Sequence, residues 1–177
     1  PASIYRAFDL RELAGLPASS DLVTVLAAAP APTEVLFGDL DLLVISRVFA
    51  TKRAPRSPLD GVALAGDPRA RWKVGMLHSA VRIPGKVETD DVIVDEAEIA
   101  ASGLDYLALG HWHSALEGRA GGTTWAYSGA PEPVAVDQDG AGTVLLVTLD
   151  DDPAAAGRVT LERIAVSRTT YRTQDID

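Results

Sequence analysis

Apolar residues recur along the chain in short runs, each bounded by glycine, proline or polar residues. Runs of this length predict buried or half-buried β-strands rather than helices. The expected strands cover residues 22–26, 34–37, 40–45, 72–77, 105–109, 123–127, 142–149 and 158–166. The second and third of these flank Gly38-Asp39, a pair typical of a hairpin turn. The pattern therefore predicts a strand-rich fold.

Helical patterns are fewer. Residues 3–15 predict a short helix, and residues 96–102 predict another. Asp95 precedes the second helix and Glu98 follows three residues later, which is the spacing of a capping box. Gly103 stands where a helix commonly ends in a left-handed residue.

The predicted helix over 96–102 lies between two predicted strands, so residues 72–109 are expected to form a strand–helix–strand unit. Such a unit belongs to the α/β class. Residues 50–70 and 80–93 are rich in turn-forming residues and predict exposed connections, the first with room for one helical turn.

The bulk composition is that of a globular protein. The chain has 177 residues, of which 47% are hydrophobic, enough for one domain with a sizeable core. No apolar run approaches the ~18 residues of a membrane span, so no membrane association is expected. The absence of cysteine excludes disulfides and thiolate metal sites and fits a cytoplasmic protein.

The net charge of −9 is unevenly distributed. Between Arg47 and Lys86 there are nine lysines and arginines against two acidic residues. The acidic net charge argues against extensive binding of nucleic acid over the protein surface. The basic segment is interpreted as a solvated connection of mixed charge, with contact to phosphate as the alternative.

All three histidines follow predicted strands. His78 comes directly after the strand over 72–77, and His111 and His113 follow the strand over 105–109. Open α/β sheets place their binding sites at the carboxyl ends of strands, and imidazole is the commonest metal ligand. A lone histidine is more often structural, but three histidines so placed favour a metal site. Without cysteine, the other ligands must be oxygens, which allows manganese, iron or zinc.

The residues around these histidines have more ordinary interpretations. Gly110 would let the backbone approach a ligand closely. Trp112 is interpreted as a core residue beneath the loop, with stacking on a base or sugar as the alternative. Trp125 and Tyr127 are expected in the core or on a face of the sheet.

The same stretches resemble the motifs of a known family. Gly110-His111-Trp112-His113, after an apolar strand, resembles the last motif of the calcineurin-like metallophosphoesterases, and Gly75–Ser79 resembles the motif before it. Tyr127–Glu132 resembles the loop that follows in the SbcD-like DNA repair exonuclease branch. Pro1–Arg6 resembles the residues just after that family's Gly-Asn-His-Asp motif, so the resemblance runs through the whole chain in order.

This resemblance implies a fold and a division of the chain. The chain would be the C-terminal half of a four-layer αββα sandwich with a mixed sheet, and its opening at Pro1 would make it a fragment. Residues 1–135 would carry the motifs, and residues 136–177 would form trailing strands.

The resemblance also implies a set of metal ligands. His78 and His111 would bind one ion of a pair and His113 the other. The remaining ligands would come from an N-terminal half of the domain that carries an Asp-x-His pair, a bridging aspartate and an asparagine, and this chain contains no asparagine. No catalytic residue is assigned here. Gly38-Asp39 and Gly66-Asp67 match the bridging motif by letters but fall in the wrong order, so they are interpreted as turns.

The expected function is therefore part of a two-metal phosphodiesterase, most similar to a DNA exonuclease of DNA repair, with manganese as the favoured ion. Its implied partners are the missing half of the domain, DNA and an SMC-like ATPase, and the chain alone is expected to be inactive. The alternatives are a phosphoesterase for nucleotides or other small molecules and a catalytically silent binding or scaffold domain. Ser79, Ser114 and Ser128 are candidates to hold the second nitrogen of a ligating histidine.

Overall fold

A computed structural model describes residues 32–49, 56–85, 92–133, 140–152 and 158–169, together with residues 24, 26, 54, 87, 135, 136, 138 and 171. The predicted helix over 3–15 lies outside the described residues, as does the predicted strand over 22–26 apart from two single positions.

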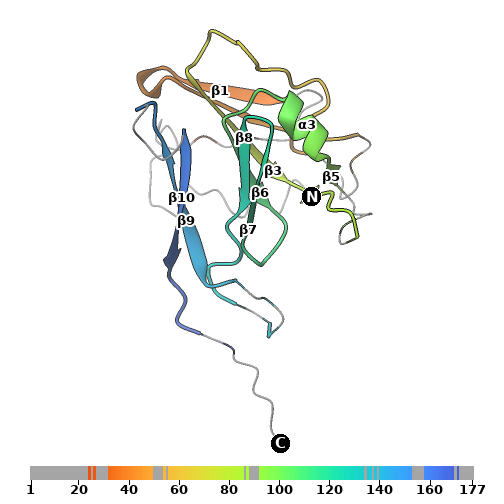
Figure 1. Ribbon diagram of the computed structural model, residues 1–177, viewed down its shortest axis with the longest axis vertical. Coiled ribbons are helices and arrows are strands. Elements are labelled where there is room, and N and C mark those ends of the chain that lie inside the picture. The colour runs from red at the N-terminus through yellow and green to blue at the C-terminus, as the bar shows by residue number, and fades with distance from the viewer. Residues whose placement is uncertain are drawn as a thin grey trace, which may run out of the picture.

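A mixed six-stranded sheet organises the described part of the chain (Figure 1). Its strands follow the order β1-β2-β3-β6-β8-β7. The four inner strands are parallel, and β1 and β7 pair antiparallel at the two edges. The strands are β1 (Thr33–Phe37), β2 (Leu42–Ser46), β3 (Trp72–His78), β6 (Tyr106–Gly110), β7 (Leu116–Ala120) and β8 (Thr123–Tyr127). The strand-rich α/β class is thus the observed one.

The predicted strand–helix–strand unit is confirmed. Strand β3 leads through the helix α3 (Glu96–Ala101) to β6, and the two strands are parallel neighbours. Asp95 caps the helix, and its backbone N–H donates to the Glu98 carboxylate at 2.8 Å, as the capping box requires. Gly103 follows with a φ of 73°, in the left-handed region.

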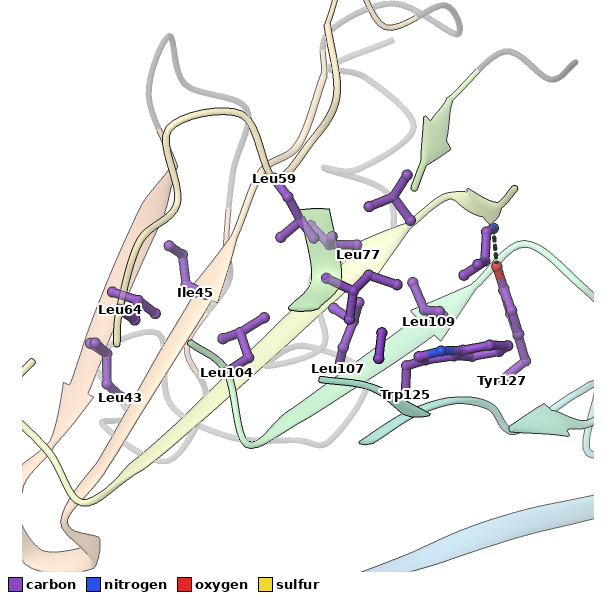
Figure 2. Packing of buried hydrophobic residues seen from close by; sticks show 14 of the residues in the cluster. Leu43, Ile45, Leu59, Leu64, Leu77, Leu104, Leu107, Leu109, Trp125 and Tyr127 are labelled. Atoms are coloured by element: carbon purple, nitrogen blue, oxygen red, sulfur yellow. Dashed lines mark hydrogen bonds between the residues drawn. The ribbon is translucent and has the colours of Figure 1, made fainter. Parts of the chain in front are cut away.

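The hydrophobic core lies on the face of the sheet that α3 covers. Because side chains alternate along a strand, the odd-numbered residues of β2, β3 and β6 share this face. They pack with Ile99 of the helix and with Trp125 and Tyr127 of β8 (Figure 2). The even-numbered residues of the same strands lie on the opposite face.

A second pair of strands flanks the sheet. Strands β9 (Thr143–Leu149) and β10 (Val159–Ala165) pair antiparallel, as their sequences predict. Arg158 fixes this pair to the sheet. Its guanidinium carbon lies 4.3 Å from the centre of the Trp72 ring, and Nη2 lies 3.1 Å from the Asp105 carboxylate.

Two predicted connections are more ordered than expected. The described part of 50–70 has no helical turn, and it places Leu59 and Leu64 in the core rather than in solvent. The predicted loop over 80–93 contains the short parallel strands β4 (Ala80–Val81) and β5 (Ile93–Val94). Burial of apolar residues overrides the turn-like composition in both places.

Two further details differ from the sequence prediction. Strand β7 was not anticipated. The turn of the predicted hairpin is longer than Gly38-Asp39. It forms the 3-10 turn η1 (Gly38–Leu40), and Asp41 completes it with a φ of 50°. Among the described residues, no helix is both long and apolar enough to cross a membrane.

We predict that Gly103→Ala destabilises the protein by about 2–4 kcal/mol. A Cβ at this position would lie 2.1 Å from the backbone nitrogen of Ala65, in addition to the cost of a left-handed alanine. Gly61→Ala is the matched control, because Gly61 has a φ of 76° and nothing within 4 Å of a Cβ, so only the conformational cost of about 1–2 kcal/mol applies. Urea unfolding measures both changes, and equal losses would refute the predicted contact.

Candidate metal centre

Parallel pairing of β3 with β6 brings two of the three histidines together. His78 ends β3 opposite Gly110, and His111 follows β6 directly. The centres of their imidazole rings lie 5.2 Å apart, with the ring planes at 86°. Both side chains are exposed at the carboxyl edge of the sheet, which is unlike a histidine that merely fills a core. The structure therefore places these two predicted ligands side by side.

Gly110 makes room for this pair. A Cβ at Gly110 would lie 3.2 Å from Nδ1 of His78, which is tighter than an ordinary contact. From the sequence, Gly110 was expected to let a ligand approach the backbone closely. In the structure, the group that lies next to Gly110 is the imidazole of His78.

His111 has an uncommon backbone conformation. Its φ is 111°, and only one other described non-glycine residue, Asp41, has a positive φ. This region costs a residue with a side chain on the order of 1–3 kcal/mol, and such conformations cluster at functional sites. The turn it creates directs the chain back after β6, next to His78.

The separation of the two rings fits a shared ion. A ring nitrogen lies about 1.2 Å from the ring centre and about 2.0–2.1 Å from a bound metal. Two imidazoles on one ion, at about 90–110° to each other, therefore hold their ring centres about 5 Å apart. The separation of His78 and His111 matches that value.

His113 has a contact of its own with Gln138. The side-chain amide of Gln138 contacts Nδ1 of His113 at 2.6 Å, so Nε2 is the nitrogen through which His113 could bind an ion. Ligating histidines are usually fixed in this way through the nitrogen that does not bind the metal.

The loop that carries these histidines is anchored to the core. Trp112 stacks on Tyr127, with ring centres 5.4 Å apart and planes at 19°. It also packs against the core cluster, as the core interpretation of this residue predicted. Tyr127 and Trp125 are buried, again as predicted. The backbone oxygen of His113 accepts a hydrogen bond from the N–H of Ala130 at 2.7 Å.

A cavity of about 580 Å³ lies against the sheet face opposite α3. Val44, Met76 and Ala108 line it from three parallel strands, and His78 and Gly110 lie at its carboxyl end. Met76 is 49% exposed. Because parallel strands are usually covered on both faces, this apolar surface suits a further layer of protein.

Four arginines in the described part of the basic segment pair with acidic residues. Arg69 pairs with Glu34 and Asp67, and its hydrogen bonds lower the pKa of the Asp67 carboxyl to about 2. The other ion pairs of this segment join Arg56 to Asp60, Arg71 to Asp151 and Arg82 to Asp95. The mixed-charge interpretation is supported for the described part of this segment.

The two Gly-Asp pairs form turns, as predicted. Gly38 and Asp39 lie in η1, and Gly66 has a φ of 71° in a turn. The Asp67 carboxylate accepts the backbone N–H of Arg69 at 2.9 Å, a common role for aspartate in a turn. Neither pair approaches the histidines as a bridging ligand would.

A complete metal site is not present among the described residues. They contain no group of three or more histidine, cysteine or carboxylate side chains that could enclose an ion. Two imidazoles can bind a divalent ion weakly, and a complete site needs further oxygen ligands.

Two supporting residues were not foreseen from the sequence. Gln138 lies in a loop without a regular pattern, and the hydroxyl of Tyr127 finds its partners far away in the chain. The serines proposed for this role behave differently. Among the described residues the Ser79 hydroxyl is buried without a hydrogen-bond partner, and the Ser128 hydroxyl donates to the backbone oxygen of Gly129.

Comparison with known proteins gives no assignment. No family model matches the chain, and no curated protein matches it.

We predict that the chain binds one Zn²⁺ ion weakly through His78 and His111. His78→Ala or His111→Ala should lower the affinity at least about tenfold, whereas Leu40→Ala, at an exposed position before β2 at the opposite edge of the sheet, should not change it. Protons compete with the metal ion for imidazole nitrogens, so affinity should be lower in acid than at neutral pH. Isothermal titration calorimetry measures each value. Tight binding that does not depend on pH would contradict the prediction.

Proposed function

We propose that this chain supplies part of the binuclear metal centre of a phosphodiesterase, within a calcineurin-like sandwich whose other half carries the remaining ligands. The observation that carries this proposal is the His78–His111 pair, 5.2 Å apart at the carboxyl ends of adjacent parallel strands. The resemblance of both motifs to that family and the positive φ of His111 support it.

Each residue has a simple task in this proposal. His78 and His111 would hold one ion, and His113 would present Nε2 to the second while Gln138 holds Nδ1. A pair of ions would lower the pKa of a bound water and neutralise the phosphate oxygens. The chain would provide neutral imidazoles in fixed positions, so that little reorganisation is needed on binding.

The apolar face of the sheet opposite α3 supports a complementary layer in this proposal. Val44, Met76 and Ala108 form an apolar surface on three of the parallel strands, and Thr24 and Leu26 line the same cavity. A second sheet on this surface would place its own carboxylate and asparagine ligands next to His78. The fold would then be the four-layer sandwich that the sequence resembles.

Two classes of substrate are candidates for this centre. The resemblance to the SbcD-like branch favours DNA, with exonuclease activity in DNA repair and an SMC-like ATPase as the associated subunit. The pairing of basic residues with acids favours the second candidate, a phosphoesterase for nucleotides or other small diesters. It leaves less uncompensated positive charge for a DNA backbone in the described part of the basic segment.

We predict that the chain, mixed with a polypeptide that carries the Asp-x-His, bridging-aspartate and asparagine motifs, hydrolyses bis-p-nitrophenyl phosphate with Mn²⁺. His111→Ala should remove the activity, and Leu40→Ala, at the opposite edge of the sheet, should retain it. Each component alone should be inactive, because each lacks ligands for a complete pair of ions. Stable association without hydrolysis would instead favour a silent scaffold domain.

The assembled protein should also degrade duplex DNA. Release of nucleotides from an end-labelled duplex at low salt measures this activity, and His113→Ala should reduce it together with hydrolysis of the small diester. Hydrolysis of the small diester alone would contradict the exonuclease assignment and support the second candidate.

A further inference from the structure

Tyr127 is the one labelled side chain in Figure 2 that reaches across from β8 to the segment after β3. It is the last residue of β8 and is 1% exposed. Burial of a tyrosine in an apolar cluster needs partners for its hydroxyl. Where those partners lie suggests what this residue does.

The hydroxyl of Tyr127 holds the chain directly after His78. It donates to the backbone oxygen of Ser79 at 2.8 Å and accepts the backbone N–H of Val81, also at 2.8 Å. Ser79 and Val81 are themselves fully buried. The two hydrogen bonds therefore fix the backbone one and three residues beyond His78.

The ring of Tyr127 holds the other histidine segment. It stacks on Trp112, the residue between His111 and His113, at a distance of 5.4 Å between ring centres. Trp125 packs edge-on against the same ring, with centres 6.1 Å apart, and limits its movement. One buried side chain thus contacts both segments that carry the candidate ligands.

We propose that Tyr127 is a positioning residue that sets the separation of the His78 and His111 imidazoles, and through it the affinity of the metal centre. The predicted effect on metal affinity rests on the proposed function, but the effect on the separation of the two imidazoles can be tested without metal. Tyr127→Phe keeps the stacked ring and removes both hydrogen bonds, so it loosens the segment after His78 and leaves the packing on Trp112.

The matched control lies at the other end of the same strand. The hydroxyl of Thr123 lies 2.7 Å from the Leu104 oxygen and 3.2 Å from the Ile99 oxygen, and Thr123 is 1% exposed. Thr123→Val likewise removes a buried hydroxyl that contacts two backbone oxygens. This hydroxyl lies at the first residue of β8, far from the carboxyl edge of the sheet. Both variants should lower the unfolding temperature, but only Tyr127→Phe should change the separation of the His78 and His111 imidazoles.

The test uses the 177-residue chain below its unfolding temperature. The first readout is the nuclear Overhauser effect between imidazole protons of His78 and His111 without metal. We expect it to weaken in Tyr127→Phe and to persist in Thr123→Val. The second readout is Zn²⁺ affinity by calorimetry, which should fall about tenfold in Tyr127→Phe and stay within about twofold in Thr123→Val.

The outcomes separate the two proposals. If Tyr127→Phe changes neither readout, or if Thr123→Val changes both equally, the positioning role is wrong. If the Overhauser effect responds as expected but wild-type affinity does not depend on His78 and His111, the positioning role holds and the proposed metal centre fails. Should Tyr127→Phe not fold, Trp112→Leu tests the same coupling from the other side, with a weaker Overhauser effect expected and an unchanged one contradicting it.

Discussion

The parallel pairing of β3 with β6 is the constraint on which the candidate site depends. The crossover through α3 makes the two strands parallel, so both end at the same edge of the sheet. Their register sets His78 opposite Gly110, where the missing side chain leaves space for the imidazole. A slip of one residue would turn His78 to the other face and separate it from His111.

The two faces of the sheet differ in what they contain: one holds the hydrophobic core, and the other holds the cavity that ends at His78. The α3 face buries a continuous core, and Tyr127 links that core to both histidine segments through its ring and its hydroxyl. The opposite face is apolar and lined as a cavity that ends at His78. Because parallel strands are usually covered on both faces, a further layer on that face would stabilise them.

The sequence predicted the regular elements whose signals are local. The capping box at Asp95 and Glu98, the left-handed Gly103 and the strand ends at the histidines all follow from spacing alone. Strand β7 did not, because Gly118 weakens its pattern and lies there to accommodate the ring of Trp125. The partners of Tyr127 lie 46 and 48 residues away, and only the folded chain brings them together.

We propose that His78 and His111 share one ion. NMR of the histidine side-chain ¹⁵N resonances during Zn²⁺ titration distinguishes a shared ion from separate binding. The resonances of His78 and His111 should shift together with one midpoint, at one ion per chain. This proposal would be contradicted if the two shifted with separate midpoints, or if only His113 responded.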